Sequence, residues 1–558
     1  MHNGAKAGRD TDGIGNYKRL IEGQWMNQAE IKRRQLQAVS MILTLLTLAV
    51  VARLTGFNGA AYTAAAVEAL TVVWLIVGGN LADTLGRLIR VRISKGQHRN
   101  AAKLRRNTMI FQMAFGLAGS LIILAGADWI ARTVFRLPYS TFILMVLSPT
   151  VCLRAISTVL LGYFQGEGIE LPTAASGVLR QFFILGFSLL FGRMLGNYGD
   201  KVSRLLVQEN FSSMYGGVGV GIAVSVAELF IVIILFLLYR GSRRSKDVMF
   251  QEGMRSTDSF VDSVRVLWFS RGWQWLTNLL LFLPIPLGLV FLQKSSAGYE
   301  LMTEYGIYVA VYWVLCGIFA ALVLMTLIPV YSRTVSCLRR DEQRFARTVF
   351  QSGVHIAVVH AVYIAVFLAV MAPQLARTFC DVQAETAQQM LRGGSVVVLL
   401  LTLVLYFGRF LNMTGGKILV LGSVGISDVV YVISATVLLN NGKTGILALI
   451  YAGILGLGVL CILLGAMSYR QLHTQPDWLQ LILMPAVAAA VAGLICTLFG
   501  KILTPHLGDP VTLLVALVIS CALYWTALLL LRNFREQELE AIPGGKLIRS
   551  LGQMLRVF

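Results

Sequence analysis

About fourteen apolar stretches, each long enough to cross a lipid bilayer, run through this chain of 558 residues. A helix needs roughly 20 predominantly apolar residues to cross the hydrocarbon core, so runs of this length predict membrane spans. Hydrophobic residues make up 56% of the chain and charged residues only 14%, whereas a soluble domain carries about 25% charged residues. The sequence therefore predicts an all-α polytopic membrane protein.

The predicted spans are grouped by polar segments into larger units. The spans cover residues 37–53, 61–79, 108–126, 139–163, 173–195, 215–239, 270–292, 306–330, 349–371, 394–411, 417–439, 444–467, 479–499 and 511–531. We predict two six-helix bundles, 37–239 and 270–467, joined by a cytoplasmic linker at 240–269. Residues 479–531 form two extra spans. The terminal segments 1–36 and 532–558 are predicted to be cytoplasmic, with an amphipathic helix in the second.

Basic residues concentrate on alternate sides of the predicted spans. Lys and Arg gather in segments 1–36, 80–107, 240–269, 332–348 and in the C-terminal tail. Cytoplasmic loops of membrane proteins carry this excess, so both termini are predicted to face the cytoplasm of a plasma-membrane protein. The loop bias and attraction to anionic lipids account for the net charge of +20, so no nucleic-acid partner is expected. The polar first 36 residues also predict that no cleavable signal peptide is present.

Several chemistries have no signature in the sequence. The seven cysteines show no paired spacing, and no metal-ligand cluster or Walker A sequence occurs. We predict no metal and no cofactor. No loop is long enough to fold as a catalytic domain, which favours a protein that is not an enzyme.

Two turns indicate an internal repeat. The turn after the fourth span reads LGYFQGEGIELPTAASGV (161–178), and the turn after the tenth reads FGRFLNMTGGKILVLGSVG (407–425). When they are aligned, Gly168 meets Gly415 and Ser176 meets Ser423. A duplication of this kind is typical of transporters whose substrate site lies between two halves.

Ionisable side chains inside the predicted spans are the first site candidates. A charge at the bilayer centre costs roughly 2.5–3.5 kcal/mol on insertion scales, so such residues normally face a protein interior or a wet cavity. Arg154 and Arg180 are predicted to line a cavity; the alternative is a structural ion pair with Glu228 or Glu68. The candidates for binding a coupling ion are Glu68, Glu228 and Asp428.

A second set of candidates lies near span ends. Arg271, Gln274 and Asn278 form a polar stripe entering the seventh span, and Arg409 ends the tenth. These residues are predicted to contact substrate, although Arg271 and Arg409 are equally consistent with snorkelling to the inner interface. A guanidinium presents a planar fork of donors that matches phosphate oxygens, so an acidic head group, above all a diphosphate, is the predicted ligand.

The seventh span contains Pro284 and Pro286 in the sequence LPIPLG. Each interior proline removes a backbone hydrogen bond and clashes with the preceding turn, so this helix is predicted to kink or break. The functional interpretation is a hinge, and the alternative is a tolerated kink without function.

Several segments together resemble a known superfamily. They are LGYFQGEGIELPTAASGVLRQ, RVRISKGQHRNAAKLRR, LPIPLG, EYGIYVAVYWVLCGIFAALVLMTLIPVYS and LEAIPGGKLIRSLGQML. In these segments the chain resembles the polysaccharide-biosynthesis branch of the multidrug/oligosaccharidyl-lipid/polysaccharide (MOP) superfamily, above all its SpoVB- and MurJ-like members. The resemblance implies two facing six-helix bundles with two extra C-terminal helices. It also implies the flipping of lipid-linked sugars, such as the undecaprenyl-diphosphate peptidoglycan precursor, across the plasma membrane.

The predicted function is therefore a flippase that works by alternating access. Its expected partners are a lipid-linked sugar diphosphate as substrate, anionic membrane lipids, and proteins of cell-wall synthesis. One alternative is a drug or cation exporter of the same superfamily. An alternative of another class is a membrane glycosyltransferase.

Overall fold

The computed structural model describes residues 28–169, 171–207, 210–246, 259–295, 301–380, 384–441, 444–534 and 550. The regular secondary structure within these residues is helical throughout. Twelve of these helices are long and apolar enough to cross a membrane, or thirteen if one bent pair counts as a single span. The predicted class, an all-α polytopic membrane protein, is confirmed.

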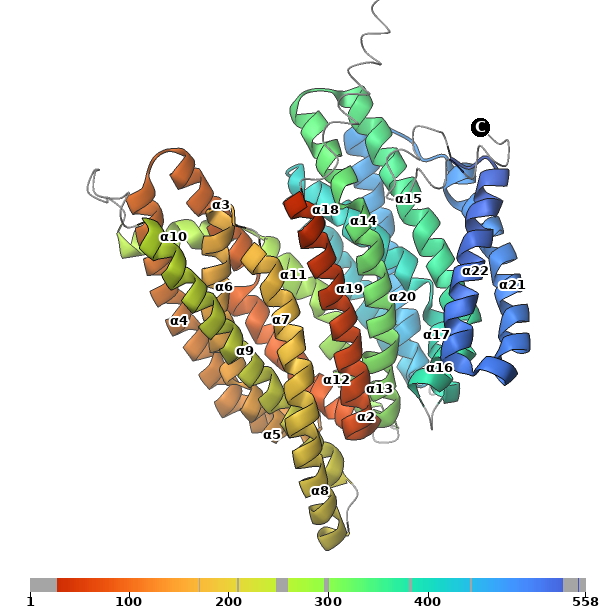
Figure 1. Ribbon diagram of the computed structural model, residues 1–558, viewed down its shortest axis with the longest axis horizontal. Helices are drawn as coiled ribbons and strands as arrows, with labels where there is room; N and C mark the ends of the chain where they lie inside the picture. The colour runs from red at the N-terminus through yellow and green to blue at the C-terminus, as the bar shows by residue number, and fades with distance from the viewer. Residues whose placement is uncertain are drawn as a thin grey trace, which may run out of the picture.

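The difference from the predicted fourteen spans arises at two bends. Helix α2 (Gln28–Gly78) is continuous through the first two predicted spans, but Gly56 inside it has φ 69°, a left-handed conformation that favours glycine. Figure 1 shows the start of α2 and the following α3 at the same upper end, so the two parts of α2 run in opposite directions. Helices α17 (Ala384–Gly394) and α18 (Val397–Met413), which are bent by 49°, form the predicted tenth span.

The first group of helices occupies the left of Figure 1, coloured orange to olive. Its members are α3 (Leu81–Ser94), α4 (His98–Trp129), α5 (Ser140–Leu147), α6 (Pro149–Gly166), α7 (Leu171–Phe187), α8 (Arg193–Leu206), α9 (Asn210–Lys246) and α10 (Phe260–Arg271). Short π-helical segments interrupt the longer spans, as between α7 and α8 at Ser188–Gly192. These helices pack on one another and on α2.

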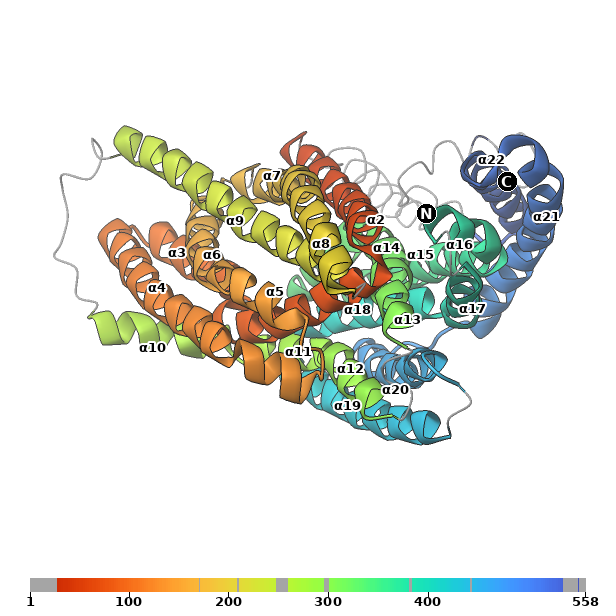
Figure 2. The ribbon, with the colours of Figure 1, turned by 90° about the horizontal axis from the view of Figure 1, so that it is seen from below.

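The second group occupies the right of Figure 1. Its members are α13 (Met302–Ile307), α14 (Val314–Arg339), α15 (Gln343–Val370), α16 (Ala372–Phe379), α17, α18, α19 (Lys417–Asn440) and α20 (Leu447–Leu472). Helices α11 (Gln274–Phe282) and α12 (Pro284–Lys294) lie between the groups and contact both α2 and α19. Seen from below in Figure 2, the same separation is visible.

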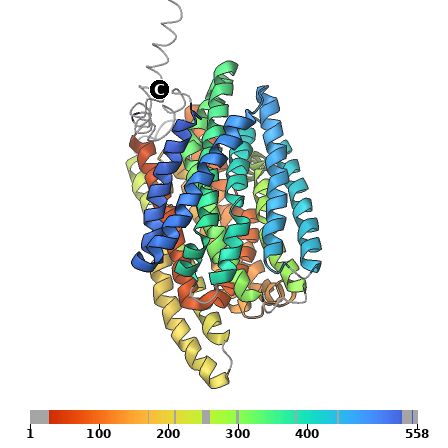
Figure 3. The ribbon, with the colours of Figure 1, turned by 90° about the vertical axis from the view of Figure 1, so that its right-hand side faces the viewer.

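The two extra C-terminal helices, α21 (Met484–Leu507) and α22 (Asp509–Leu530), form the outer edge of the second group, as Figure 3 shows. Helix α21 packs on α15, and α22 is joined to α15 by hydrogen bonds inside the membrane-spanning part. The Tyr524 hydroxyl donates to the Val359 carbonyl at 2.7 Å, and the Tyr363 hydroxyl lies 2.8 Å from the Ser520 hydroxyl. Of the predicted cytoplasmic tail, 532–558, the structure describes residues 532–534 and Ser550, so the predicted amphipathic helix lies outside the described residues apart from Ser550.

The two turns of the predicted repeat have the same backbone geometry. Gly168, after α6, has φ 78°, and Gly415, after α18, has φ 98°. In each turn the next residue donates to the carbonyl five positions earlier, from Ile169 to Phe164 at 2.9 Å and from Gly416 to Leu411 at 2.8 Å. This is the Schellman arrangement, which needs a left-handed residue at the aligned glycine. The sequence similarity therefore corresponds to a shared structural motif.

The groups meet around the bend of α2. Gly306 of α13 lies so close to the Phe57 carbonyl that a side chain there would collide with the backbone. The Thr303 hydroxyl donates to the Asn58 side-chain oxygen at 2.6 Å. The largest buried apolar cluster also includes residues of both groups, among them Leu144 and Leu449. The bend of α2 is therefore a point at which the two groups of helices are in direct contact.

Candidate anion site in the first group of helices

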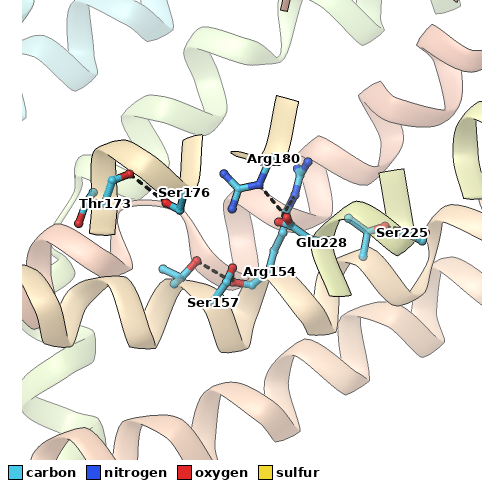
Figure 4. Close-up of polar contacts among 9 residues, drawn as sticks. Arg154, Ser157, Thr173, Ser176, Arg180, Ser225 and Glu228 are labelled. Atoms are coloured by element: carbon cyan, nitrogen blue, oxygen red, sulfur yellow. Dashed lines mark hydrogen bonds and ion pairs between the residues drawn. The ribbon is translucent and has the colours of Figure 1, made fainter. Parts of the chain in front are cut away.

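Arg154, Arg180 and Glu228 form one cluster, although they come from three different helices. Glu228 on α9 accepts from the Arg154 Nε of α6 at 3.0 Å through Oε1, and from the Arg180 Nε of α7 at 2.7 Å through Oε2. Figure 4 shows the two guanidinium groups converging on the one carboxylate. Both arginines thus form the ion pair given as the alternative in the sequence analysis, with Glu228 and not with Glu68, and their predicted place in a cavity stays a prediction.

The three side chains differ in exposure and do not balance in charge. The Glu228 side chain is 1% exposed, whereas those of Arg154 and Arg180 are 26% and 23% exposed. Two guanidinium groups against one carboxylate leave an excess of one positive charge. Each arginine donates to Glu228 through Nε alone, so its terminal N–H groups stay available in the described structure. The cluster is thus a cationic site with its counter-charge buried beneath it.

Local structure holds Arg154 in place. Its backbone carbonyl accepts hydrogen bonds from the Ser157 and Thr158 hydroxyls at 3.1 and 2.7 Å. On the opposite helix, Ser225 lies one turn before Glu228; it donates to the Val146 carbonyl at 2.8 Å and also contacts Thr150. These hydroxyls bond backbone carbonyls and one another, so the hydrogen bonds described here do not include the guanidinium groups.

Glu68 takes part in a different contact, between the two groups of helices. It is 4% exposed on α2, and its Oε1 accepts from the Tyr305 hydroxyl of α13 at 2.7 Å. Its Oε2 is buried without a hydrogen-bond partner in the described structure. Glu68 therefore does not belong to the anion site and links the two groups instead.

Asp428 on α19 also has a buried oxygen, Oδ2, that lacks a partner among the described residues. Its side chain is half-buried. The structure does not bring Asp428 into the Arg154 and Arg180 cluster. It stays a candidate coupling residue of the second group.

Arg271 caps the end of α2 in this structure, and its predicted contact with substrate stays a prediction. It is 3% exposed, and its guanidinium donates to three carbonyls at the end of α2, those of Leu75 at 3.2 Å, Ile76 at 2.9 Å and Gly79 at 3.0 Å. It also lies over the rings of two tryptophans, Trp268 and Trp275. A cation at a helix C-terminus satisfies carbonyls that have no partner within the helix. The guanidinium is buried, so the snorkelling alternative does not describe it.

The other predicted polar residues are dispersed. The Gln274 Oε1 accepts from Asn80, the residue before α3, at 3.2 Å. Asn278 is half-buried on α11, and Arg409 is exposed on α18 of the second group. Gln274 therefore helps to attach α11 to the first group near Arg271. The residues of the predicted stripe do not share one contact.

The proline pair breaks the seventh span as predicted. Helix α11 ends at Phe282, and α12 begins at Pro284, with Pro286 buried in its first turn. Both parts of the span, before and after the break, pack on α2 and on α19. Its use as a hinge stays a prediction.

The contact between Glu68 and Tyr305 was not predicted from the sequence. Tyr305, Tyr308 and Tyr312 lie at helical spacing on one face, and their rings follow one another at 5.8 and 5.6 Å between centroids. The spacing i, i+3, i+7 within EYGIYVAVYW was a visible signal of a shared face. It does not reveal which residue of a distant helix the face contacts.

Outside the spans, one cap has a clear electrostatic effect. Helix α10 begins with a capping box, in which Ser259 and Asp262 each bond the other's backbone N–H. The Ser259 hydroxyl and backbone N–H both donate to the Asp262 carboxylate, at 2.6 and 3.3 Å, and these two hydrogen bonds lower its pKa. Within the described residues, no group of three or more His, Cys, Asp or Glu side chains is arranged to hold a metal ion.

The fold and the buried charges define a multi-pass α-helical membrane protein with two groups of helices and an internal cationic site. No protein-family model matches the sequence, and no curated protein matches it by sequence. Solved structures with the same fold do exist. The lipid II flippase MurJ, in an inward closed conformation, matches with a TM-score of 0.61 and 12% identity over 89% of this chain and 98% of its own.

Two further structures agree. An inward-facing multidrug-resistance MATE transporter of the MOP superfamily matches with a TM-score of 0.58 and 15% identity, over 78% of this chain and 98% of its own. A MOP-superfamily transporter from Pyrococcus furiosus, described as having a binding pocket of reverse polarity, matches with a TM-score of 0.56 and 14% identity, over 80% and 95%. The chain thus has the fold of MOP-superfamily transporters, as the sequence resemblance implied.

Proposed function

We propose that this protein is a flippase that moves an undecaprenyl-diphosphate-linked sugar, a peptidoglycan precursor or a polysaccharide repeat unit, across the plasma membrane. The fold similarity supports a transporter, because its solved neighbours are transporters and a flippase. The observation that carries the substrate class is the pair Arg154 and Arg180, with one carboxylate between two guanidinium groups.

The charge and donor geometry of the pair suit a diphosphate. A guanidinium stays charged at any physiological pH and binds phosphate oxygens through parallel N–H groups. Glu228 occupies the Nε side of both arginines and fixes their spacing. The terminal N–H groups of two neighbouring guanidiniums then offer one binding edge to each phosphoryl group of a diphosphate.

Transport would proceed by alternating access. The two groups of helices rock around the site while the lipid tail stays in the bilayer, and no covalent step is involved. The contact of Glu68 with Tyr305 joins the groups on one side of the molecule in this structure. Glu68 and Asp428 are the carboxyl groups proposed to couple transport to an ion gradient or to the membrane potential.

The alternatives are less well supported by the side chains. A drug or cation exporter of the same fold needs a site of acidic and aromatic residues, whereas the cluster found here is cationic. A membrane glycosyltransferase needs catalytic carboxylates outside the membrane on a folded loop. The helical architecture described here resembles transporters instead.

Depletion of the protein in its host tests the proposed function. Synthesis of the lipid-linked precursor continues while translocation stops, so the precursor should accumulate on the cytoplasmic leaflet. Loss of a drug exporter should change only the accumulation of cationic dyes. Loss of a glycosyltransferase should change the chemical structure of the lipid-linked pool. Normal precursor sidedness in a strain without a second flippase would contradict the proposal.

A further inference from the structure

We infer that Glu228 is a built-in competitor of the transported anion: it shares both guanidinium groups with the phosphates and weakens their binding enough for release. This inference rests on the proposed function, since it concerns the same arginine pair. It assigns a role to the one carboxylate of the cluster that is neither exposed nor able to bind an anion itself.

The Glu228 carboxylate is buried against both arginines. Glu228 is 1% exposed, and each of its two oxygens accepts from a different arginine, at 3.0 and 2.7 Å. An ionised carboxylate with this burial is stable only when paired, and here two cations pair with it. It is therefore held in the site when no substrate is bound.

Glu228 sets the net charge of the cluster. With Glu228 the cluster carries one excess positive charge, and without it two. A diphosphate that enters the partly exposed side of the arginines places its negative charge beside the carboxylate, and the repulsion between these like charges opposes its binding. Glu228 thus lowers the affinity for any phosphate without removing the donors that recognise it.

Transport requires an intermediate affinity for the ligand. A translocated ligand must bind strongly enough to enter and weakly enough to leave. Two uncompensated guanidinium groups in a low-dielectric interior would retain a diphosphate. When the phosphates leave, Glu228 pairs with both guanidinium groups without a competing anion, and this favours the release step.

The experiment measures the affinity of the purified full-length protein for inorganic pyrophosphate by isothermal titration calorimetry, in four versions: wild type, Glu228→Gln, Arg154→Gln/Arg180→Gln and the triple variant. Glutamine keeps the shape of the side chain and removes its charge. Glu228→Gln should bind pyrophosphate roughly tenfold more tightly, corresponding to about 1.4 kcal/mol. The gain should vanish in the triple variant, because Glu228 acts only through the arginines.

Two further measurements separate this role from a structural one. Glu385→Gln removes the same charge from an exposed position on α17 and should leave the pyrophosphate affinity unchanged. The reconstituted Glu228→Gln protein should also show a lower maximal rate of translocation together with a lower half-saturating substrate concentration. A merely structural glutamate would lower the melting temperature and the affinity together.

The outcomes are distinguishable from failure of the proposed function. If Glu228→Gln retains its melting temperature and binds pyrophosphate no more tightly than wild type, the competitor role is overturned. If wild type and the double arginine variant bind pyrophosphate equally well, the anion site and the proposed function both fail. Should Glu228→Gln not fold, Glu228→Asp gives a second test, because the shorter carboxylate pairs less closely with the two arginines. It should then bind pyrophosphate more tightly than wild type, and an equal or weaker affinity would overturn the role.

Discussion

Two arginine sites in this protein, one buried and one partly exposed, show opposite relations between a cation and its surroundings. Arg271 is 3% exposed and donates to three carbonyls at the end of α2. Arg154 and Arg180 keep about a quarter of their side chains exposed and share one carboxylate through Nε alone. An arginine inside a span is therefore not by itself a sign of function. The number of donors that its neighbours leave unused is the more informative quantity.

The comparison also separates two roles in the architecture. Arg271 anchors the start of the seventh span to the end of α2, close to the Asn80 and Gln274 contact. The Arg154 and Arg180 pair contributes only one ion-pair network among α6, α7 and α9. The first site stabilises the fold, and the second is available for a ligand.

The largest expected effect on stability is that of Arg271→Ala. It removes the side-chain donor from three carbonyls, of which, among the described residues, only that of Leu75 also accepts from a backbone N–H, that of Gly79. It also removes the cation that lies over the rings of Trp268 and Trp275. The free energy of unfolding should therefore fall by about 3 to 5 kcal/mol. Thermal melting in detergent measures the change, with Arg154→Ala as the matched control. If both variants melt together, within the error of the measurement, the proposed distinction between the two arginine sites is wrong.

A smaller effect is expected at the contact between the groups of helices. Tyr305→Phe removes the hydroxyl that donates to Glu68 and leaves a buried carboxyl group without a partner, which should cost about 1 to 3 kcal/mol. Tyr451→Phe, at a position that is 38% exposed, is the control for losing a hydroxyl. An unchanged melting temperature for Tyr305→Phe would show that Glu68 is satisfied by another group.

The effect on stability should be smaller still at the anion site. In Arg154→Gln or Arg180→Gln the remaining arginine still pairs with Glu228, and the lost pair is partly exposed, so the expected change is about 1 kcal/mol or less. The same melting assay measures it. A loss as large as that of Arg271→Ala would make the pair a structural element and would remove the basis of the proposed site.

Membrane orientation can be tested with no expected change in stability. In a protein without native cysteines, Lys201→Cys should react with a membrane-impermeant thiol reagent on intact cells, and Lys95→Cys only after the membrane is opened. Both lysines are exposed, whereas the native Cys337 and Cys380 are 7% and 0% exposed and make poor probes. Burial also raises the pKa of the Cys337 thiol, which slows its labelling further. The reverse labelling pattern would place the basic loops outside the cell.

The sequence was most informative where its signal is local. Apolar length predicted the helical class, the Pro284 and Pro286 pair predicted the break between α11 and α12, and the aligned glycines at 168 and 415 predicted two turns that do share one geometry. Each of these depends on a few adjacent residues and on the backbone alone.

Pairings between distant helices were less predictable. The sequence identified Arg154, Arg180 and Glu228 as unusual but did not decide between a cavity role for the arginines and an ion pair with Glu228 or Glu68, since this depends on how α6, α7 and α9 pack. The partners of Arg271 were not predicted for the same reason, because the end of α2 lies almost 200 residues earlier in the chain. Burial and partner, rather than residue type, separate the anchor from the site.

The most direct test of the account is translocation of a fluorescent undecaprenyl-diphosphate-linked sugar in proteoliposomes. We predict that wild type moves it between leaflets, that Arg154→Gln/Arg180→Gln reduces the rate by roughly 100-fold, about 2.7 kcal/mol, and that Arg154→Lys/Arg180→Lys restores only part of it, because lysine keeps the charge and loses the fork. The double glutamine variant leaves the buried Glu228 without either arginine and should melt at a lower temperature than the other two proteins. The three rates are therefore compared at a temperature at which each protein is folded. Translocation at the wild-type rate by a folded Arg154→Gln/Arg180→Gln protein would contradict the central claim that these two guanidinium groups carry the diphosphate.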